Sequence, residues 1–257
     1  MYEGGEAAME QITSRKNPWI QTLRALAADA SARRAQGLFL CDGQKTLSDA
    51  LHSAAAVDAV FWKGSADSAA LSADTAQYLL PPELYDYVCP LKNSPGPLFT
   101  VRIPERSAEG PISNAIVLEN VQDPGNVGTV IRTANAFQIG AVILCGSCAD
   151  LYSPKTVRAT MGAIFRQRVL TAALEELPAL LKHNGLPLYA AALSARAQDI
   201  HTLDLHRSAV AVGSEGRGLS EDFLALCDGQ LIIPMNPDSE SLNAAVAASV
   251  IMWEMFR

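Results

Sequence analysis

The sequence predicts an α/β protein in which a parallel sheet forms the larger, C-terminal part and a small α/β domain precedes it. The chain has 257 residues, of which 49% are apolar and 18% are charged, so it can bury one large core or two ordinary ones. After residue 114, short continuous apolar segments alternate with helix-patterned segments, which is typical of a parallel sheet covered on both faces. A turn-rich and charged break, PERSAEGPIS at residues 104–113, separates this part from the first.

The first part, residues 1–105, has mixed helix and strand signals and the usual size of a small domain. It contains no sharp catalytic motif. The patterns predict helices over residues 18–35, 44–53 and 82–88, and strands over residues 38–41, 59–62 and 98–103.

The second part, residues 112–257, has the regular alternation that predicts the parallel sheet. In its final helix, Leu242, Val246, Val250 and Trp253 are spaced for one apolar face. The expected strands cover residues 115–121, 141–145, 167–170, 188–193, 209–212 and 230–234, and the expected helices cover residues 127–137, 154–165, 174–183, 221–226 and 242–256.

Several classes of protein are excluded by composition. No apolar run reaches the roughly 20 residues of a membrane helix. The first residues lack the basic and apolar regions of a secretory signal, so we expect a soluble cytoplasmic protein with reduced thiols. Cys145 and Cys148 form a CxxC, but no second pair of ligands for zinc follows, so no metal is expected. A redox role for this pair is the alternative to two thiols that flank the end of a strand.

The charge distribution is uneven. The formal net charge of −7 weighs against phosphate binding, because affinity for nucleic acid depends largely on phosphate neutralisation. Two basic islands nevertheless stand out, at residues 13–45 and 151–170, and the second contains no carboxylate. The islands are compatible with RNA binding and equally with solvated helix faces.

Three segments follow predicted strands, at the edge where open parallel sheets bind their ligands. The first is ENVQDPGNVG at residues 119–128. Asn126 is expected to cap the next helix, and Gly128 to let something bulky approach its first turn. Arg132 lies further along and would face a ligand over the helix start. The alternative is a well-capped turn with a surface arginine.

The second segment, GSEGRG at residues 213–218, has three glycines in six residues. It lacks the GK[ST] of a P-loop and the GxGxxG of dinucleotide-binding proteins. Glu215 would repel phosphates, so the loop suits a neutral or cationic ligand. A bare tight turn is the alternative.

The third segment runs from IIPMNP at residues 232–237 to SLNAAV at residues 241–246. Pro234 is expected to end a strand, and a polar loop then delivers Ser241 and Asn243 to the start of the last helix. Ser241 as a simple helix cap and Met235 as loop packing are the alternatives.

Taken together, the order and spacing of these segments closely resemble the SpoU (TrmH-like) branch of the SPOUT RNA methyltransferases. Residues 153–163, SPKTVRATMGA, are similar to another stretch of that family, and the resemblance covers residues 114–257. Residues 1–105 resemble the L30e-like substrate-binding domain that often accompanies this catalytic domain.

The resemblance implies a C-terminal trefoil knot, a bound S-adenosylmethionine and a homodimer whose partner packs near Trp253 and the last helix. The implied catalytic residues are Arg132, Asn126, Glu215, Ser241 and Asn243. The implied cofactor-binding residues are Val212, Gly213, Gly218, Ile233, Met235, Ser241 and Leu242.

The implied reaction is transfer of a methyl group to a ribose 2′-hydroxyl. A guanidinium stays protonated at neutral pH, so we expect Arg132 to hold a neighbouring phosphate and stabilise the developing oxyanion rather than act as a base. The candidates for contacts with RNA are Arg15, Lys16, Arg33, Arg34, Lys155 and Arg158.

By analogy, the two-domain layout favours ribosomal RNA, of the 23S type, over transfer RNA. A transfer-RNA 2′-O-methyltransferase and a catalytically silent RNA-binding module are the alternatives, and a resistance-conferring ribosomal methyltransferase would use the same chemistry. A small-molecule enzyme with a nucleotide cofactor would need one of the phosphate-loop fingerprints that are missing here.

Overall fold

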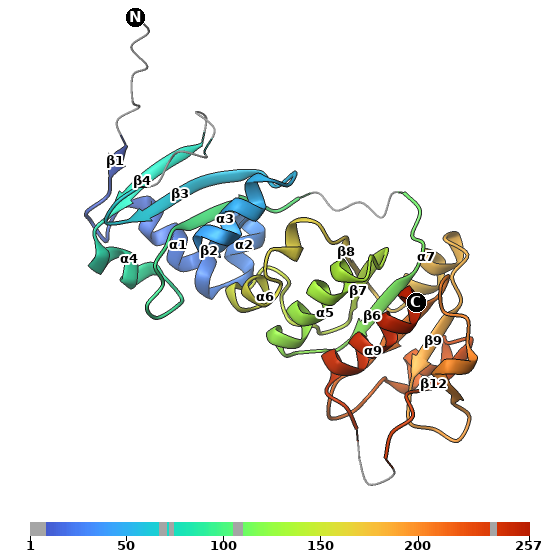
Figure 1. Ribbon diagram of the computed structural model, residues 1–257. Helices are drawn as coiled ribbons and strands as arrows, with labels where there is room; N and C mark the ends of the chain where they lie inside the picture. The colour runs from blue at the N-terminus through green and yellow to red at the C-terminus, as the bar shows by residue number, and fades with distance from the viewer. Residues whose placement is uncertain (1–8, 67–70, 72–74, 105–109, 237–240) are drawn as a thin grey trace, which may run out of the picture. The chain divides into compact units, whose positions relative to one another are not determined.

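The computed structural model describes residues 9–66, 71, 75–104, 110–236 and 241–257 (Figure 1). The chain divides into two compact units. The smaller one extends to Pro104 and includes Tyr152–Pro154, and the larger one contains the rest. Part of the predicted break, residues 105–109, lies outside the described residues.

The smaller unit contains a five-stranded mixed sheet with helices packed against it. The strand order is β1-β4-β3-β5-β2, in which β3 and β4 are parallel while β5 is antiparallel to both β3 and β2. Ile20, Leu23, Phe61 and Tyr85 are completely buried in its core. The elements are β1 (Glu10–Gln11), α1 (Pro18–Ala28), α2 (Ala30–Gln36), β2 (Leu38–Asp42), α3 (Gln44–Leu51), β3 (Val57–Lys63), β4 (Ala76–Leu80), α4 (Pro82–Val88) and β5 (Leu98–Arg102).

One helix of this unit differs from the prediction. The segment 18–35 forms two helices, because Asp29 is extended and its carboxylate accepts a hydrogen bond from the Ser31 N–H at 2.7 Å, which caps α2. The helix over residues 82–88 is confirmed, whereas β4 was not predicted. The likeness of this unit to L30e stays a prediction.

The larger unit confirms the predicted α/β class. Its seven strands are all parallel in the order β10-β12-β9-β11-β6-β7-β8, and Figure 1 labels β6, β7, β8, β9 and β12. The predicted strands 141–145 and 209–212 are confirmed at both ends. The strands are β6 (Ala115–Glu119), β7 (Ala141–Cys145), β8 (Val169–Ala172), β9 (Leu188–Ala191), β10 (Gln198–Asp199), β11 (Ala209–Val212) and β12 (Gly229–Ile232).

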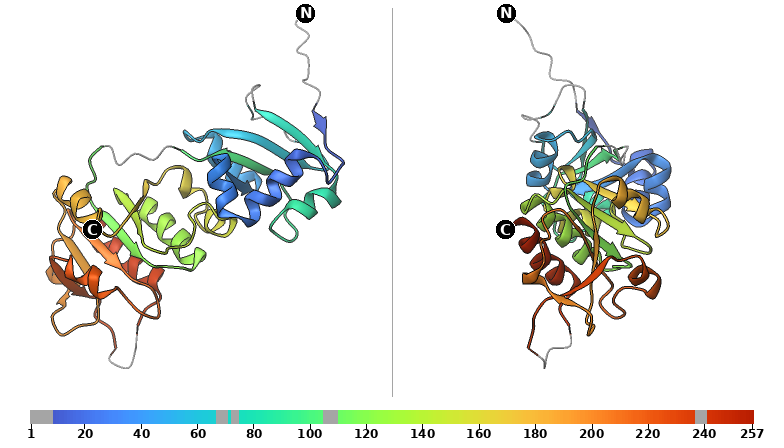
Figure 2. Two further views of the ribbon diagram at one scale, coloured as in Figure 1. Left: turned by 180° about the vertical axis from the view of Figure 1, so that it is seen from behind. Right: turned by 90° about the vertical axis from the view of Figure 1, so that its right-hand side faces the viewer.

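Helices cover both faces of this sheet. On one face, Val117, Ile143 and Ala211 pack with Leu177 of α7 and Phe223 of α8. Side chains alternate along a strand, so the neighbouring positions face the other side, where α5 and α9 lie next to each other (Figures 1 and 2). The helices are α5 (Pro124–Ala136), α6 (Pro154–Ala159), α7 (Leu177–His183), α8 (Glu221–Ala225) and α9 (Ala244–Phe256), with short 3₁₀ turns η1 (Ala163–Phe165) and η2 (Ile200–Thr202).

Several boundaries differ from those predicted. The segment 154–165 is not one helix, because Met161 and Gly162 adopt positive φ angles of 49° and 83° and break it. Strand β8 begins two residues later than predicted, α7 begins at Leu177 and α9 begins at Ala244. Strand β10 was not predicted.

Two of the four residues in the predicted apolar stripe of the last helix, Val246 and Trp253, face outward. Val246 and Trp253 are each 49% exposed, whereas the side of α9 toward the sheet carries Ala248, Ile251 and Met252, all fully buried. Spacing alone could not identify the buried side, because α9 is apolar on nearly all sides. The Trp253 ring lies 5.6 Å from that of Phe137, centroid to centroid.

None of the helices in the described ranges is long and apolar enough to cross a membrane. The knot that the resemblance implies stays a prediction.

Candidate functional site

The strand order creates a switch point between β6 and β11. From β6 the chain continues to β7 and β8 on one side, whereas β11 and β9 lie on the other. Ligands of open α/β sheets bind outside the carboxyl ends of the strands at such a point. The segment 119–128 follows β6, and the segment 213–219, which we call the glycine loop, follows β11.

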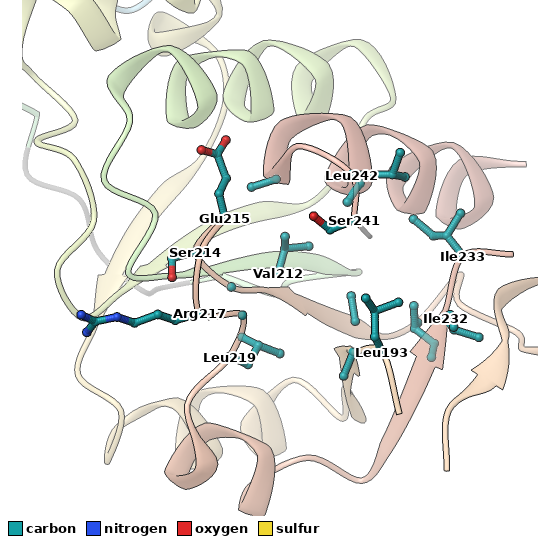
Figure 3. Close-up of a pocket in the computed structure, with 18 of the residues that line it drawn as sticks. Leu193, Val212, Ser214, Glu215, Arg217, Leu219, Ile232, Ile233, Ser241 and Leu242 are labelled. Carbon is teal, nitrogen blue, oxygen red and sulfur yellow. The ribbon is translucent and has the colours of Figure 1, made fainter. Parts of the chain in front are cut away.

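A pocket of about 400 Å³ opens at this edge of the sheet (Figure 3). Its volume is that of a typical small-molecule site. The glycine loop, the ends of β9 and β12 and the start of α9 all contribute to its walls. Every residue that the sequence assigned to the cofactor lines it: Val212, Gly213, Gly218, Ile233, Met235, Ser241 and Leu242.

Three polar side chains, one from each segment, meet at the rim of this pocket. The Asn243 amide Nδ2 donates to Glu215 Oε1 at 2.6 Å and to Asn126 Oδ1 at 3.1 Å. The Asn126 amide also donates to the same carboxylate oxygen of Glu215. Glu215 points from the glycine loop toward α5 (Figure 3). Residues separated by up to 117 positions in sequence are thus joined in one hydrogen-bonded cluster.

The helix caps differ from those predicted. Helix α5 begins at Pro124, and its cap is Asp123, whose carboxylate accepts from the Asn126 N–H at 2.8 Å. Asn126 therefore lies inside the first turn, where its side chain can reach Glu215. Asn243, not Ser241, caps α9, and its Oδ1 accepts from the N–H groups of Ala245 and Val246 at 2.9 and 3.2 Å.

Gly128 makes room for protein rather than for a ligand. A β-carbon on this residue would lie 2.4 Å from the Ala159 β-carbon and 2.7 Å from the Thr156 carbonyl oxygen, so α6 occupies the space that the sequence analysis reserved for a ligand. Gly213 is needed for a similar reason. A β-carbon there would lie 2.1 Å from the carbonyl carbon of Gly218, because the glycine loop closes tightly on itself.

Arg132 is exposed on α5 and is not among the residues that line the pocket. It follows Asn126 by six residues, which corresponds to about 9 Å along the helix axis and a turn of about 240° around it. The structure therefore brings Asn126, Glu215, Ser241 and Asn243 together, and places Arg132 on another face of α5.

The cations predicted for RNA fall into two groups. Arg15, Lys16 and Arg34 are exposed on the smaller unit, and Lys155 and Arg158 are exposed on α6 of the larger unit. Arg33 differs from the prediction: it is only 4% exposed, and its guanidinium donates to the Leu26 carbonyl oxygen inside the smaller unit. It is therefore not part of the cationic surface.

Two arginines surround Tyr87, an arrangement that no sequence motif predicted. The guanidinium carbons of Arg15 and Arg24 lie 4.2 and 4.6 Å from the centre of its ring, and Arg24 also donates to the Tyr87 hydroxyl. Tyr87 follows Arg24 by 63 residues, so no local pattern could indicate that they meet.

Cys145 and Cys148 flank the end of β7 as expected. The Cys148 thiol donates to the carbonyl oxygens of Leu118 and Cys145 at 3.2 and 3.3 Å. Burial raises the pKa of both thiols, which disfavours the reactive thiolate. Within the described part of the chain, no group of three or more His, Cys, Asp or Glu side chains could hold a metal ion.

Comparison with known proteins identifies the family. The model of the SpoU rRNA Methylase family matches residues 113–253. The chain is 32% identical to an uncharacterized tRNA/rRNA methyltransferase of Synechocystis sp., covering 96% of this chain and 93% of that one. It is 29% identical to the 23S rRNA (guanosine(2553)-2′-O)-methyltransferase RlmP of Bacillus subtilis, covering 96% and 99%. The solved structure of an AdoMet-bound rRNA methyltransferase from Sinorhizobium meliloti matches with a TM-score of 0.85 and 26% identity, covering 96% and 97%. The chain therefore belongs to the SpoU rRNA methylase family.

Proposed function

We propose that this protein transfers a methyl group from S-adenosylmethionine to a ribose 2′-hydroxyl of ribosomal RNA. The observation that carries the proposal is the convergence of three separate segments on one pocket at the switch point of the sheet, with Asn126, Glu215 and Asn243 bonded together at its rim. The relative from Bacillus subtilis, which matches over nearly its whole length, is named as a 23S rRNA 2′-O-methyltransferase.

The pocket fits S-adenosylmethionine. Val212, Leu219 and Leu242 give it apolar walls of the kind that hold a flat heteroaromatic ring (Figure 3). The strand ends beside them present backbone N–H and C=O groups that can fix the orientation of a ring. Glu215 adds a carboxylate at the edge, which favours a positively charged group. When bound, the cofactor supplies a methyl group that its sulfonium already activates for transfer.

The chain's own residues then position and polarise the ribose hydroxyl. Asn126 and Asn243 fix Glu215, so the carboxylate stays at one place on the rim. Such preorganised groups lower the barrier because they need not reorient during the reaction. We assign to Arg132 the binding of a phosphate next to the target ribose and the stabilisation of negative charge that develops on the 2′-oxygen, for which an exposed guanidinium on a rigid helix is suited.

For the RNA, we propose that residues 1–105 form the substrate-binding domain and residues 112–257 the methyltransferase domain. In the first, Arg15, Arg24 and Tyr87 form an ordered cationic and aromatic group, and Lys16 and Arg34 add charge. Guanidinium planes bind phosphates and stack on bases, which suits unpaired RNA. Lys155 and Arg158 would contact RNA close to the methyltransferase domain.

We further propose a homodimer and a cytoplasmic location. Val246, Trp253 and Phe256 on the outer side of α9 are each nearly half exposed, and the rings of Trp253 and Phe256 pack against that of Phe137. Contiguous exposed aromatic residues of this kind mark interaction sites, and a second copy would cover them.

The activity is tested with methyl-labelled S-adenosylmethionine and three RNA samples: unmodified ribosomal RNA, assembled subunits and transfer RNA. We expect label in ribosomal RNA at a position that becomes resistant to alkaline cleavage, because a 2′-O-methyl group blocks the attacking hydroxyl. The Glu215→Ala variant is the negative control. Label in transfer RNA alone would replace the proposed substrate, and cofactor binding without transfer to any of the three would favour a catalytically silent module.

A further inference from the structure

Glu119 is a buried carboxylate that the mechanism above does not use. It is the last residue of β6 and is 4% exposed. Oε2 accepts a hydrogen bond from the Ser220 N–H at 2.8 Å, and Oε1 accepts from the Ser220 hydroxyl at 2.6 Å. No lysine, arginine or histidine of the described ranges pairs with it. The two hydrogen bonds from Ser220 therefore hold this carboxylate in place.

Both of these hydrogen bonds require an acceptor at position 119. The Ser220 hydroxyl oxygen already accepts from the Phe223 N–H at 3.1 Å, as the N-cap of α8, so its own proton points to Glu119. A backbone N–H can only donate. A glutamine would offer one oxygen and one NH₂ group, so the Ser220 hydroxyl would have to turn its proton away and accept from the NH₂, and two charge-assisted hydrogen bonds would become neutral ones. The contact thus favours a carboxylate over a neutral amide at this position.

Ser220 is the residue that immediately follows the glycine loop. At the other end of the loop, Gly213 is fixed by its close approach to Gly218, and Ser214 bridges to Gly218. The Glu119 carboxylate therefore anchors the second end, where the loop enters α8.

Between these two anchors the glycine loop forms one wall of the pocket. Ser214, Glu215 and Leu219 border the cavity (Figure 3), and Glu215 joins the cluster with Asn126 and Asn243. Glu119 is not among the residues that line the pocket, so it can act on a ligand only through the loop.

From this arrangement we propose that Glu119 is a positioning residue, which holds the glycine loop in its ligand-binding shape through Ser220. The proposal rests on the proposed function for the identity of the ligand, S-adenosylmethionine. It goes beyond that function because it assigns cofactor affinity to a side chain outside the pocket.

The variant Glu119→Gln tests the proposal, and Asn114→Ala is its matched control. Asn114 is also buried, at 8% exposed, and lies next to the other end of β6, where it accepts from the Gly140 N–H at 2.8 Å and donates to the His206 carbonyl oxygen at 3.3 Å. Both variants lose buried hydrogen bonds beside the same strand. Only Glu119→Gln is expected to raise the Kd for S-adenosylmethionine, by about tenfold, as measured by calorimetry.

Variants at Ser220 provide a second, independent test. Ser220→Ala removes the hydroxyl and is expected to weaken cofactor binding, whereas Ser220→Thr keeps both the hydroxyl and the N–H and is expected to restore it. In the double variant Glu119→Gln/Ser220→Ala, the two effects on Kd are expected to be less than additive, because both changes remove the same contact.

Hydrogen exchange gives a measurement that needs no ligand. We expect the amides of residues 213–220 to exchange about tenfold faster in Glu119→Gln than in the wild type, and to be unchanged in Asn114→Ala. If the wild type does not bind S-adenosylmethionine, the proposed function fails, while this exchange pattern still decides the role of Glu119. A Glu119→Gln variant with an unchanged loop exchange rate, or with wild-type cofactor affinity despite a lower Tm, overturns the proposal.

Discussion

Asn243 joins the start of α9 to the glycine loop through the two ends of one side-chain amide. Its oxygen caps the helix, and its nitrogen donates to the Glu215 carboxylate at 2.6 Å. The stability of the helix and the geometry of the pocket rim thus depend on the same group, and suitable substitutions separate the two.

Asn243→Asp and Asn243→Ala are expected to differ in stability, while both are expected to lose activity. Alanine loses the cap and lowers the free energy of unfolding by about 1 kcal/mol, whereas aspartate keeps the cap. Both lose the bond to Glu215, and aspartate adds a like charge, so both are expected to reduce methyl transfer by about tenfold or more. Denaturant unfolding and single-turnover rates measure the two effects. An active aspartate variant would show that the rim does not need the amide.

Arg132→Ala is expected to leave folding and cofactor affinity unchanged, because the side chain is exposed and lies outside the pocket lining. The single-turnover rate with RNA should fall by about 10²-fold, the usual cost of removing a group that stabilises developing charge. Arg132→Lys keeps the charge and should lose less.

A pH series distinguishes the two roles of Arg132. If the guanidinium stabilises charge, the pH dependence of the transfer rate should have the same shape in the wild type, Arg132→Ala and Arg132→Lys. A rise with pH in the wild type that disappears in both variants would instead identify a general base.

Gly128→Ala is expected to lower the free energy of unfolding by about 1–3 kcal/mol, because the new methyl group would overlap Ala159 and the Thr156 carbonyl of α6. Gly216→Ala is the control, since its β-carbon would meet no atom within 4 Å. Thermal unfolding compares them. Equal melting temperatures would mean that α6 moves aside without cost.

The Cys227 thiol should make stability depend on alkaline pH. Burial raises its pKa from 9.0 to about 11. The unfolded chain therefore loses this proton at a lower pH than the folded one. The contribution of the Cys227 thiol to the free energy of unfolding is thus complete below about pH 9 and is lost as the pH rises toward 11. Urea unfolding between pH 9 and 11 should show that the free energy of unfolding falls less with rising pH in Cys227→Ala than in the wild type. Identical slopes would exclude the contribution.

Trp253→Lys is expected to convert a dimer to a monomer while the fold is kept, because the ring is half exposed within one chain. Sedimentation measures the mass of the assembly. Leu226→Lys, at a residue that is 39% exposed on another part of the larger unit, is the control and should leave the assembly unchanged. A wild type that sediments as a monomer at all concentrations would refute the dimer.

The sheet of the larger unit was predictable because its strands are short, apolar and fully buried. In β7 and β11, every residue is buried, so the apolar run and the strand coincide. Helix ends were harder to place. From the sequence, Asn126 was expected to cap α5 and Ser241 was the cap considered for α9, whereas the backbone conformation places the caps at Asp123 and Asn243.

The site was predictable as a set of segments but not as a set of contacts. The motifs identified Asn126, Glu215 and Asn243, and the structure joins them. The burial of Arg33 could not be foreseen, because its guanidinium donates to a backbone carbonyl, that of Leu26, which no residue type reveals. The link from Glu119 to Ser220 spans 101 residues and depends on how α8 meets the end of β6.

Helix α9 has a consequence for ligand titrations. Ala244 and Ala247 of α9 line the cavity, whereas Val246 and Trp253 of the same helix are exposed to solvent. A second copy that binds to this exposed side would therefore also restrain the residues of α9 that line the cavity, because both belong to one continuous helix. If the dimer forms, the measured Kd for a small ligand should therefore depend on the protein concentration, so binding should be titrated at several protein concentrations.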